Sequence, residues 1–182
     1  MTKKEIDTIL VRGNSHTLYA PGLRIGVTKL QVFLSIQPLL KGKSYWYALR
    51  SSFESSDNLL VYKGDINYAF TKAEPDREYL MTKKERDYLA SLPDKIKIYR
   101  GMTCVEKASK DFGISWSLNK SVAYFFKDTY GRNYSTNGLK KVVYEQTVNK
   151  KDVIAFFDGR NESEIIYLSE QKVLTIKEQY PR

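Results

Sequence analysis

Apolar residues in the first half of the chain recur mainly at helical spacing. Between Val27 and Leu40 they stand mostly three or four residues apart, which predicts a helix with one buried face. Tyr45–Phe53 predicts a second helix with an aromatic face, and Asp65–Lys72 predicts a third. We therefore expect the first half of the chain to be mainly helical.

Capping signals and turn-forming residues bound these helices. Thr2 and Thr82 each precede the sequence Lys-Lys-Glu, a capping box that predicts a helix beginning at the next residue. The first such helix is expected over residues 3–10, and the second is expected to end before Pro93. Residues 12–26 include glycines and a proline and are expected to form a loop.

The second half of the chain changes to the patterns typical of strands. Lys95–Tyr99 alternates strictly between polar and apolar residues, and Gly113–Ser117 is a second short strand candidate. Asn119 is a suitable N-cap for a helix that runs through Phe126. Four more strand candidates with short connections follow: Lys140–Val148, Asp152–Phe157, Glu164–Leu168 and Lys172–Glu178.

These elements predict an α+β fold. The chain has 182 residues, of which 42% are hydrophobic, enough for one good core. We expect a single domain, in which a helical N-terminal part (residues 1–93) packs on a mainly antiparallel β-rich core (residues 94–182).

Charge and composition narrow the partners. The net charge of +9 favours an anionic partner, such as a nucleotide, a nucleic acid or an acidic protein surface. The basic residues are scattered, so a dedicated nucleic-acid arm is not expected. One cysteine and one histidine exclude an intramolecular disulfide and a His/Cys metal cluster, so we expect no metal. No long apolar segment is found, and we expect no membrane span and a cytoplasmic location.

A pair of carboxylates stands at the entry of one predicted strand. Glu162 and Glu164 are two residues apart, before the apolar run that ends at Leu168. Residues at i and i+2 of a strand point to the same face, so the two acids are expected to lie side by side, where their charges repel. Taken alone, the pair is more typical of a solvated strand end than of a functional site.

Two other short elements precede this pair. Arg100 ends a strand and is followed by Gly101, which lets a ligand approach the backbone. Ser115 and Ser117 place two hydroxyls on one face of a second strand. Each element is weak evidence by itself, because such residues are frequent on surfaces, but their order along the chain is more specific.

An arginine strand, a Ser-x-Ser strand followed by a helix, and a Glu-x-Glu strand entry resemble the Arg-Ser-Glu class of mono-ADP-ribosyltransferases. The similarity covers roughly residues 96–178 and includes SWSLNKSVAYFFK, KVVYEQTVNKKDVIA and RNESEIIYL. The segment Leu92–Gly101, with the pattern LPD-x-x-x-x-YRG, also resembles uncharacterised bacterial and phage proteins. The resemblance implies a two-sheet β core with an NAD cleft, and the protein would be a bacterial or phage effector.

The resemblance also implies roles for the residues that match. Arg100 would contact phosphate or ribose oxygens of the co-substrate NAD. Ser115 would support the nicotinamide ribose and the catalytic acid, as the first serine of the Ser-x-Ser element that ends at Ser117. Glu164 would stabilise the oxocarbenium ion as nicotinamide leaves. Glu162 would orient or deprotonate the acceptor, and in the family a Glu-x-Glu pair goes with protein arginine acceptors.

Three further NAD contacts follow from the same resemblance, one of them through Ser117. Phe126 would stack on nicotinamide, and the Gly101 backbone would bind its carboxamide. Trp116 replaces the middle residue of the family's Ser-Thr-Ser pattern and is expected to face away from the site. Gly159 stands where the family often carries an aromatic residue that contacts the protein substrate, which leaves acceptor choice less well specified than NAD binding.

Three alternatives remain open at this level. The chain could hydrolyse NAD, with water as the acceptor, or transfer ADP-ribose to a nucleic acid, which also fits the charge of +9. It could instead be a non-enzymatic, basic module that binds nucleic acid or protein through its 14 tyrosines. That third alternative needs no affinity for NAD.

Overall fold

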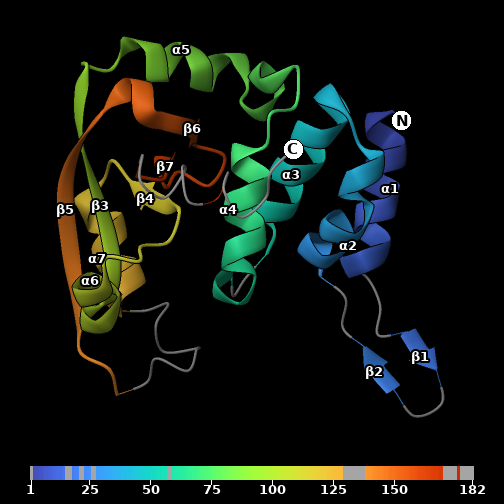
Figure 1. Ribbon diagram of the computed structural model, residues 1–182, viewed down its shortest axis with the longest axis horizontal. Coiled ribbons are helices and arrows are strands. Elements are labelled where there is room, and N and C mark those ends of the chain that lie inside the picture. The colour runs from blue at the N-terminus through green and yellow to red at the C-terminus, as the bar shows by residue number, and fades with distance from the viewer. Residues whose placement is uncertain are drawn as a thin grey trace. The chain divides into compact units, whose positions relative to one another are not determined.

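The chain divides into two compact units, Met1–Leu80 and Met81–Arg182 (Figure 1). The computed structural model describes residues 2–14, 18–20, 23–25, 28–56, 59–128, 138–169 and 176. The sequence pattern placed the change from helices to strands at residue 93. The unit boundary lies earlier because helix α5 (Lys83–Ser91) packs against strand β6 (Val153–Phe157) of the second unit.

The first unit is mainly helical, as its periodicity predicts. Its helices are α1 (Lys3–Asn14), α2 (Lys29–Ile36), α3 (Gly42–Glu54) and α4 (Lys63–Thr71), with 3-10 turns η1 (Gln37–Leu39), η2 (Leu59–Tyr62) and η3 (Arg77–Leu80). Tyr45 and Trp46 lie edge to face, 5.1 Å apart between ring centroids, and both are fully buried. Phe53 and Phe70 form a second edge-to-face pair at 5.1 Å. Aromatic packing of this kind forms the core of the unit.

The loop prediction for residues 12–26 was wrong in part. Helix α1 continues to Asn14, and two short strands, β1 (Leu18–Ala20) and β2 (Leu23–Ile25), pair in an antiparallel ladder (Figure 1). Each strand is only three residues long, too short for the alternation that identifies a strand in a sequence.

The second unit contains a five-stranded antiparallel sheet in the order β5-β3-β4-β7-β6. Its remaining strands are β3 (Lys95–Thr103), β4 (Ser115–Ser117), β5 (Lys141–Asn149) and β7 (Glu164–Tyr167). Besides α5, the helices α6 (Cys104–Ser109) and α7 (Lys120–Asp128) accompany it, and a 3-10 turn, η5 (Lys150–Asp152), joins β5 to β6. This confirms the α+β class. Apart from Ile176, the strand predicted at residues 172–178 lies outside the described residues.

One face of this sheet forms an apolar core. Ile98 and Met102 of β3 are buried there with Trp116 of β4 and Ile165 of β7. Leu89 of α5 packs against the same cluster. Trp116 therefore lies on the face opposite to Ser115 and Ser117, because neighbouring residues of a strand point in opposite directions.

Helix α7 covers the other face, and Gly101 sets its distance from β3. A Cβ atom on Gly101 would lie 2.4 Å from the Ala123 carbonyl oxygen and 2.6 Å from the Lys127 amide nitrogen. Both atoms belong to the backbone of α7, so any side chain at position 101 requires the helix to move. Glycine is thus needed here for packing.

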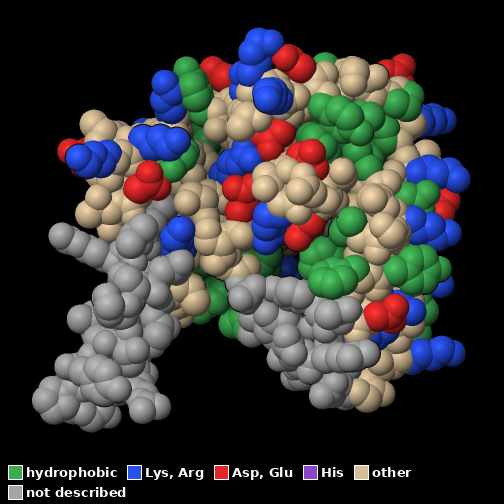
Figure 2. Space-filling model, turned by 180° about the vertical axis from the view of Figure 1, so that it is seen from behind, with side chains coloured by type: hydrophobic (Ala, Val, Ile, Leu, Met, Phe, Trp, Pro, Cys, Tyr) green, Lys and Arg blue, Asp and Glu red, His purple; other side chains and the backbone are tan. Residues whose placement is uncertain are grey.

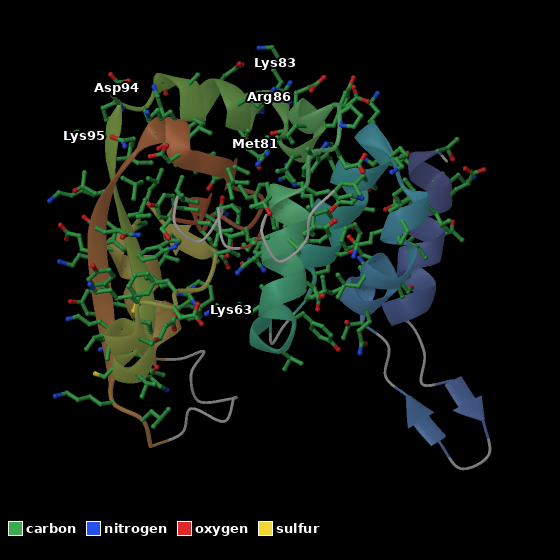
Figure 3. The ribbon with its side chains drawn as sticks, viewed as in Figure 1. Lys63, Met81, Lys83, Arg86, Asp94 and Lys95 are labelled. Atoms are coloured by element: carbon green, nitrogen blue, oxygen red, sulfur yellow. The ribbon has the colours of Figure 1, made fainter. Side chains whose placement is uncertain are left out.

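Helix α5 begins at a capping box that the sequence correctly predicts. The Thr82 hydroxyl oxygen accepts a hydrogen bond from the Glu85 amide, and the Glu85 carboxylate accepts one from the Thr82 amide at 2.7 Å. The Arg86 guanidinium donates to the Met81 carbonyl oxygen at 2.6 Å, which joins two of the residues labelled in Figure 3. The other Glu85 carboxylate oxygen accepts from the Asp158 amide at 3.0 Å, so α5 holds the turn after β6.

Candidate active site

Ser115 and Glu164 meet across two neighbouring strands. Ser117 lies directly opposite Glu164 in the β4–β7 ladder, which makes Ser115 a diagonal neighbour of Glu164 on the same face. The Ser115 hydroxyl donates a short hydrogen bond to Glu164 Oε1. Glu164 is only 5% exposed, so its carboxylate is held in a largely dry position. The structure thus brings together two residues that are 49 positions apart in the chain.

Arg100 contacts the backbone of Ser115 from the other face of the sheet. Arg100 is two residues from both Ile98 and Met102 along β3, so its side chain begins on the same, core-facing side of the strand. Its Nη1 donates to the Ser115 carbonyl oxygen at 2.6 Å. Arg100 is therefore joined to Ser115 through the backbone, and Ser115 stands between Arg100 and Glu164.

Glu106 of α6 holds the Arg100 guanidinium in place. Its Oε1 accepts from Arg100 Nε at 2.8 Å and from the Gly113 amide at 3.0 Å. A Cβ atom on Gly113 would lie 2.4 Å from Arg100 Nη2, so glycine leaves the space that the guanidinium occupies. Sequence reasoning missed Glu106, although Thr103 three residues earlier caps α6 and offered the Thr-x-x-Glu signal of a helix start.

Ser117 ties the turn before β7 to the start of α7. Its hydroxyl donates to the Glu162 carbonyl oxygen at 2.7 Å and accepts from the Asn119 amide at 2.9 Å. Asn119 in turn accepts from the Ser121 amide at 2.9 Å, which makes it the predicted N-cap. Ser117 is 5% exposed, and its hydroxyl serves to hold the backbone around the site.

Glu162 does not lie on a strand, which corrects the alternation predicted for the pair. Strand β7 begins at Glu164, and Glu162 precedes it between Asn161 (φ 57°) and Ser163 (φ 45°). Because these two residues have left-handed backbone, the side chains of this segment do not alternate between the two faces of the sheet as they would in a strand. The Ser163 amide and hydroxyl both bond to Asp158 Oδ1, and the Leu118 amide donates to the Ser163 carbonyl at 3.0 Å.

Arg160 lies against both carboxylates, and sequence reasoning assigned it no role. Its Nη2 is 2.8 Å from Glu162 Oε2 and 3.6 Å from Glu164 Oε2. The repulsion expected between the two acids is thus offset by a shared cation. Arg160 precedes Glu162 by two residues and Glu164 by four. This spacing alone does not predict contact with both acids, which depends on the conformation of the turn.

Gly101 and Phe126 lie on or against α7. The Gly101 backbone pairs with Val143 in the β3–β5 ladder, and its Cα faces α7. Phe126 is half-buried, with its ring centroid 5.6 Å from that of Phe125. Because Tyr99 pairs with Ser117, the odd-numbered residues of β3 share a face with Ser115 and Glu164, and α7 lies on that face.

Charges of both signs are interspersed over one face of the molecule (Figure 2). No helix among the described residues is long and apolar enough to span a membrane. Within the same residues, no group of three or more His, Cys, Asp or Glu side chains is placed to hold a metal ion.

Comparison of the chain with known protein families, curated proteins and solved structures found no match. Function is therefore inferred from the residues of the site themselves.

Proposed function

We propose that this protein is an NAD-dependent mono-ADP-ribosyltransferase that transfers ADP-ribose to an arginine side chain of a protein. The proposal includes a two-sheet ADP-ribosyltransferase-like core with an NAD cleft. The observation that carries it is the hydrogen bond from Ser115 to the buried carboxylate of Glu164, with Arg100 attached to the Ser115 carbonyl. Residues from three strands thereby form one connected group.

Glu164 is suited to stabilise a developing cation. In the proposed reaction the bond between the ribose C1′ and the nicotinamide nitrogen breaks, and nicotinamide leaves neutral with the electron pair. The positive charge that develops on the ribose is met by the fixed Glu164 carboxylate, whose Oε1 is oriented by Ser115. The acceptor nitrogen then bonds to C1′ and loses its proton. We assign Glu162 as the base that takes up this proton.

Arg100 is assigned two tasks. Its Nε and Nη1 are used by Glu106 and by the Ser115 carbonyl, which keeps β3 and β4 in register at the site. The Nη2 group lies beside the Cα of Gly113, a residue without a side chain to cover it. We assign Nη2 to a phosphate oxygen of NAD, because guanidinium groups bind phosphate with good geometry.

Incubation with NAD labelled in the adenylate part, in a cell lysate, tests the proposal. Wild-type protein should label macromolecules, and Glu164→Gln should lower the initial rate by roughly 100-fold or more, as expected when charge stabilisation of a transition state is removed. Glu145→Gln is the matched control, because Glu145 is an exposed acid on β5 that pairs with Lys97 at 3.0 Å. It should label at the wild-type rate.

Equal labelling by Glu164→Gln and wild-type protein would refute the assignment of Glu164. Absence of both label and nicotinamide release from folded wild-type protein would refute the enzymatic proposal as a whole. That second result would favour the binding-module alternative. Nuclease and protease digestion of the labelled product separates a nucleic-acid acceptor from a protein one.

NAD hydrolysis is the second candidate, and one observation favours it. The Glu162 carboxylate, which the transfer reaction needs for the acceptor, is already paired with Arg160 at 2.8 Å. Water needs no such carboxylate to reach C1′ on the ribose. Hydrolysis would give nicotinamide release without label transfer, and Glu162→Ala would leave that release unchanged.

A further inference from the structure

One arginine of the chain contacts both acids of the Glu-x-Glu pair. Arg160 Nη2 lies 2.8 Å from Glu162 Oε2 and 3.6 Å from Glu164 Oε2. The Arg160 side chain is 45% exposed, whereas the side chains of Glu162 and Glu164 are 25% and 6% exposed. A solvent-accessible guanidinium therefore covers two more deeply placed carboxylates.

The positions of the two acids are fixed by other bonds. Ser117 holds the Glu162 carbonyl oxygen at 2.7 Å, and Ser115 holds Glu164 Oε1. Asp158 holds the amide of Ser163 between them at 3.2 Å. Removal of the Arg160 side chain thus leaves the Glu162 backbone and the Glu164 carboxylate held in place, without the cation that lies against both acids.

We infer that Glu162 and Glu164 form a guanidinium subsite that Arg160 fills in the absence of acceptor, which makes Arg160 a specificity-determining residue. The inference rests on the proposed function, in which the acceptor group is itself a guanidinium. An acceptor arginine must displace Arg160 to reach Glu164, so acceptors that bring no competing cation are excluded from the subsite.

The balance of charges makes this exchange feasible. The Arg160 side chain is 45% exposed, so water can solvate it as it leaves, while the largely buried carboxylates require a replacement cation. An incoming guanidinium forms the same ion pairs with Glu162 and Glu164 and offsets the repulsion between the two carboxylates. A substrate without a cation would leave two carboxylates facing each other, which is unfavourable.

The kinetic test uses agmatine as a soluble guanidino acceptor and compares wild type with Arg160→Ala, Arg160→Gln and Arg160→Lys. In the Ala and Gln variants the KM for agmatine should fall roughly threefold to tenfold, because the internal competitor is gone. Arg160→Lys keeps a competing cation, so its KM for agmatine should lie between that of wild type and those of the Ala and Gln variants.

Lys83→Ala is the matched control for the loss of one positive charge. Lys83 is 82% exposed on α5 and pairs with Asp87. Its removal should leave the KM for agmatine unchanged. An unchanged or higher KM in Arg160→Ala and Arg160→Gln, with NAD cleavage intact, would overturn the inference and leave the proposed function standing.

A binding measurement without NAD separates the two claims. Carboxyl ¹³C NMR signals of Glu162 and Glu164 are followed during titration with guanidinium chloride below denaturing concentrations. Arg160→Ala and Arg160→Gln should show a saturable shift of both signals, and wild type should need several-fold more guanidinium. Absence of a saturable shift in the variants would overturn the subsite, whether or not NAD is cleaved. A saturable shift with no NAD cleavage in wild type would support the subsite and refute the enzyme.

Discussion

Ser115 and Ser117 show how two similar residues on one strand face take different tasks. The Ser115 hydroxyl bonds to a carboxylate, whereas the Ser117 hydroxyl bonds to two backbone groups. The first bond orients a charged group that can react. The second holds the turn before β7 against the start of α7.

Ser115→Ala and Ser117→Ala should therefore differ in which property they change. Ser115→Ala should lower the rate of nicotinamide release roughly tenfold or more, because Glu164 loses its orienting donor. Ser117→Ala should lower the free energy of unfolding by about 1 kcal/mol, because the part-buried hydrogen bonds to the Glu162 carbonyl and the Asn119 amide are lost. Initial rates and urea unfolding curves of both variants measure the two effects.

The opposite pattern would contradict these roles. If Ser115→Ala kept the full rate of NAD cleavage, its hydroxyl would not orient Glu164 during the reaction. If Ser117→Ala unfolded at the same urea concentration as wild type, water would be replacing its two backbone bonds.

At the scale of elements, α7 approaches β3 closely at Gly101. A methyl group there would meet the backbone of Ala123 and Lys127 at 2.4 and 2.6 Å, and backbone atoms of a helix cannot move aside singly. The requirement for glycine thus comes from helix–strand packing, in addition to any contact with NAD.

Gly101→Ala should destabilise the second unit by about 1–3 kcal/mol, the usual cost of overpacking. Gly64→Ala is the matched control, because Gly64 lies in α4 with nothing within 4 Å of its Cβ position. That change should be neutral or slightly stabilising, since alanine favours helix. Urea unfolding followed by circular dichroism measures both, and an equal midpoint for wild type and Gly101→Ala would show that α7 yields.

Elements with strong local signals were predicted closely. The capping boxes at Thr2 and Thr82 are both present, and the alternation of Lys95–Tyr99 identifies the first part of β3. Helix α6 was missed because it is only six residues long, too short for a periodic pattern. The helix predicted over Val27–Leu40 ends at Ile36 as an α-helix, since Pro38 leads into a 3-10 turn.

The candidate site was predictable only in its main residues. Arg100, Ser115 and Glu164 were found through the order of three motifs. The position of Glu162 was not, because local alternation assumes extended backbone, and residues 161 and 163 are left-handed. Arg160 and Glu106 escaped notice because their roles depend on how a turn and a short helix fold back on the strands.

At the scale of the whole molecule, charge affects the two units in different ways. The net charge of +9 gives a general attraction for anions. In the first unit the Glu74 carboxylate, on a largely covered side chain, lies against two lysines. Its side chain is 5% exposed and bonds to Lys72 at 2.9 Å, with Lys41 at 3.5 Å.

This cluster makes the stability of the first unit depend on pH. Burial by itself raises the pKa of the Glu74 carboxyl, but the hydrogen bonds from Lys72 and the Gly42 amide, with the charges of Lys72 and Lys41, lower it below the ordinary value of 4.5. A lowered pKa in the folded state means that the contribution is complete above the unfolded-state value. It is lost as pH falls through the folded-state value.

Glu74→Gln should therefore destabilise the first unit by about 1 kcal/mol at pH 7 and have a smaller effect as the pH is lowered past 4.5. Trp46 reports on this region, because its indole donates to the Pro75 carbonyl at 2.7 Å. Urea unfolding of both proteins, followed by Trp46 fluorescence in a Trp116→Phe background, gives the difference at each pH. A difference that stays constant down to pH 3 would show that Glu74 is not the titrating group.

The sheet of the second unit is uneven in mechanical terms. Strands β3 and β5 pair at nine positions, but β3 and β4 pair only at Tyr99 and Ser117. The sheet thus consists of two groups of paired strands, β5–β3 and β4–β7–β6, joined at one narrow seam between β3 and β4. The hydrogen bond from Arg100 to the Ser115 carbonyl crosses that seam. A small opening of that seam would change the distance between Arg100 and Glu164 without breaking either ladder. The group of residues proposed to cleave NAD therefore lies along the strand boundary with the fewest paired positions in the sheet.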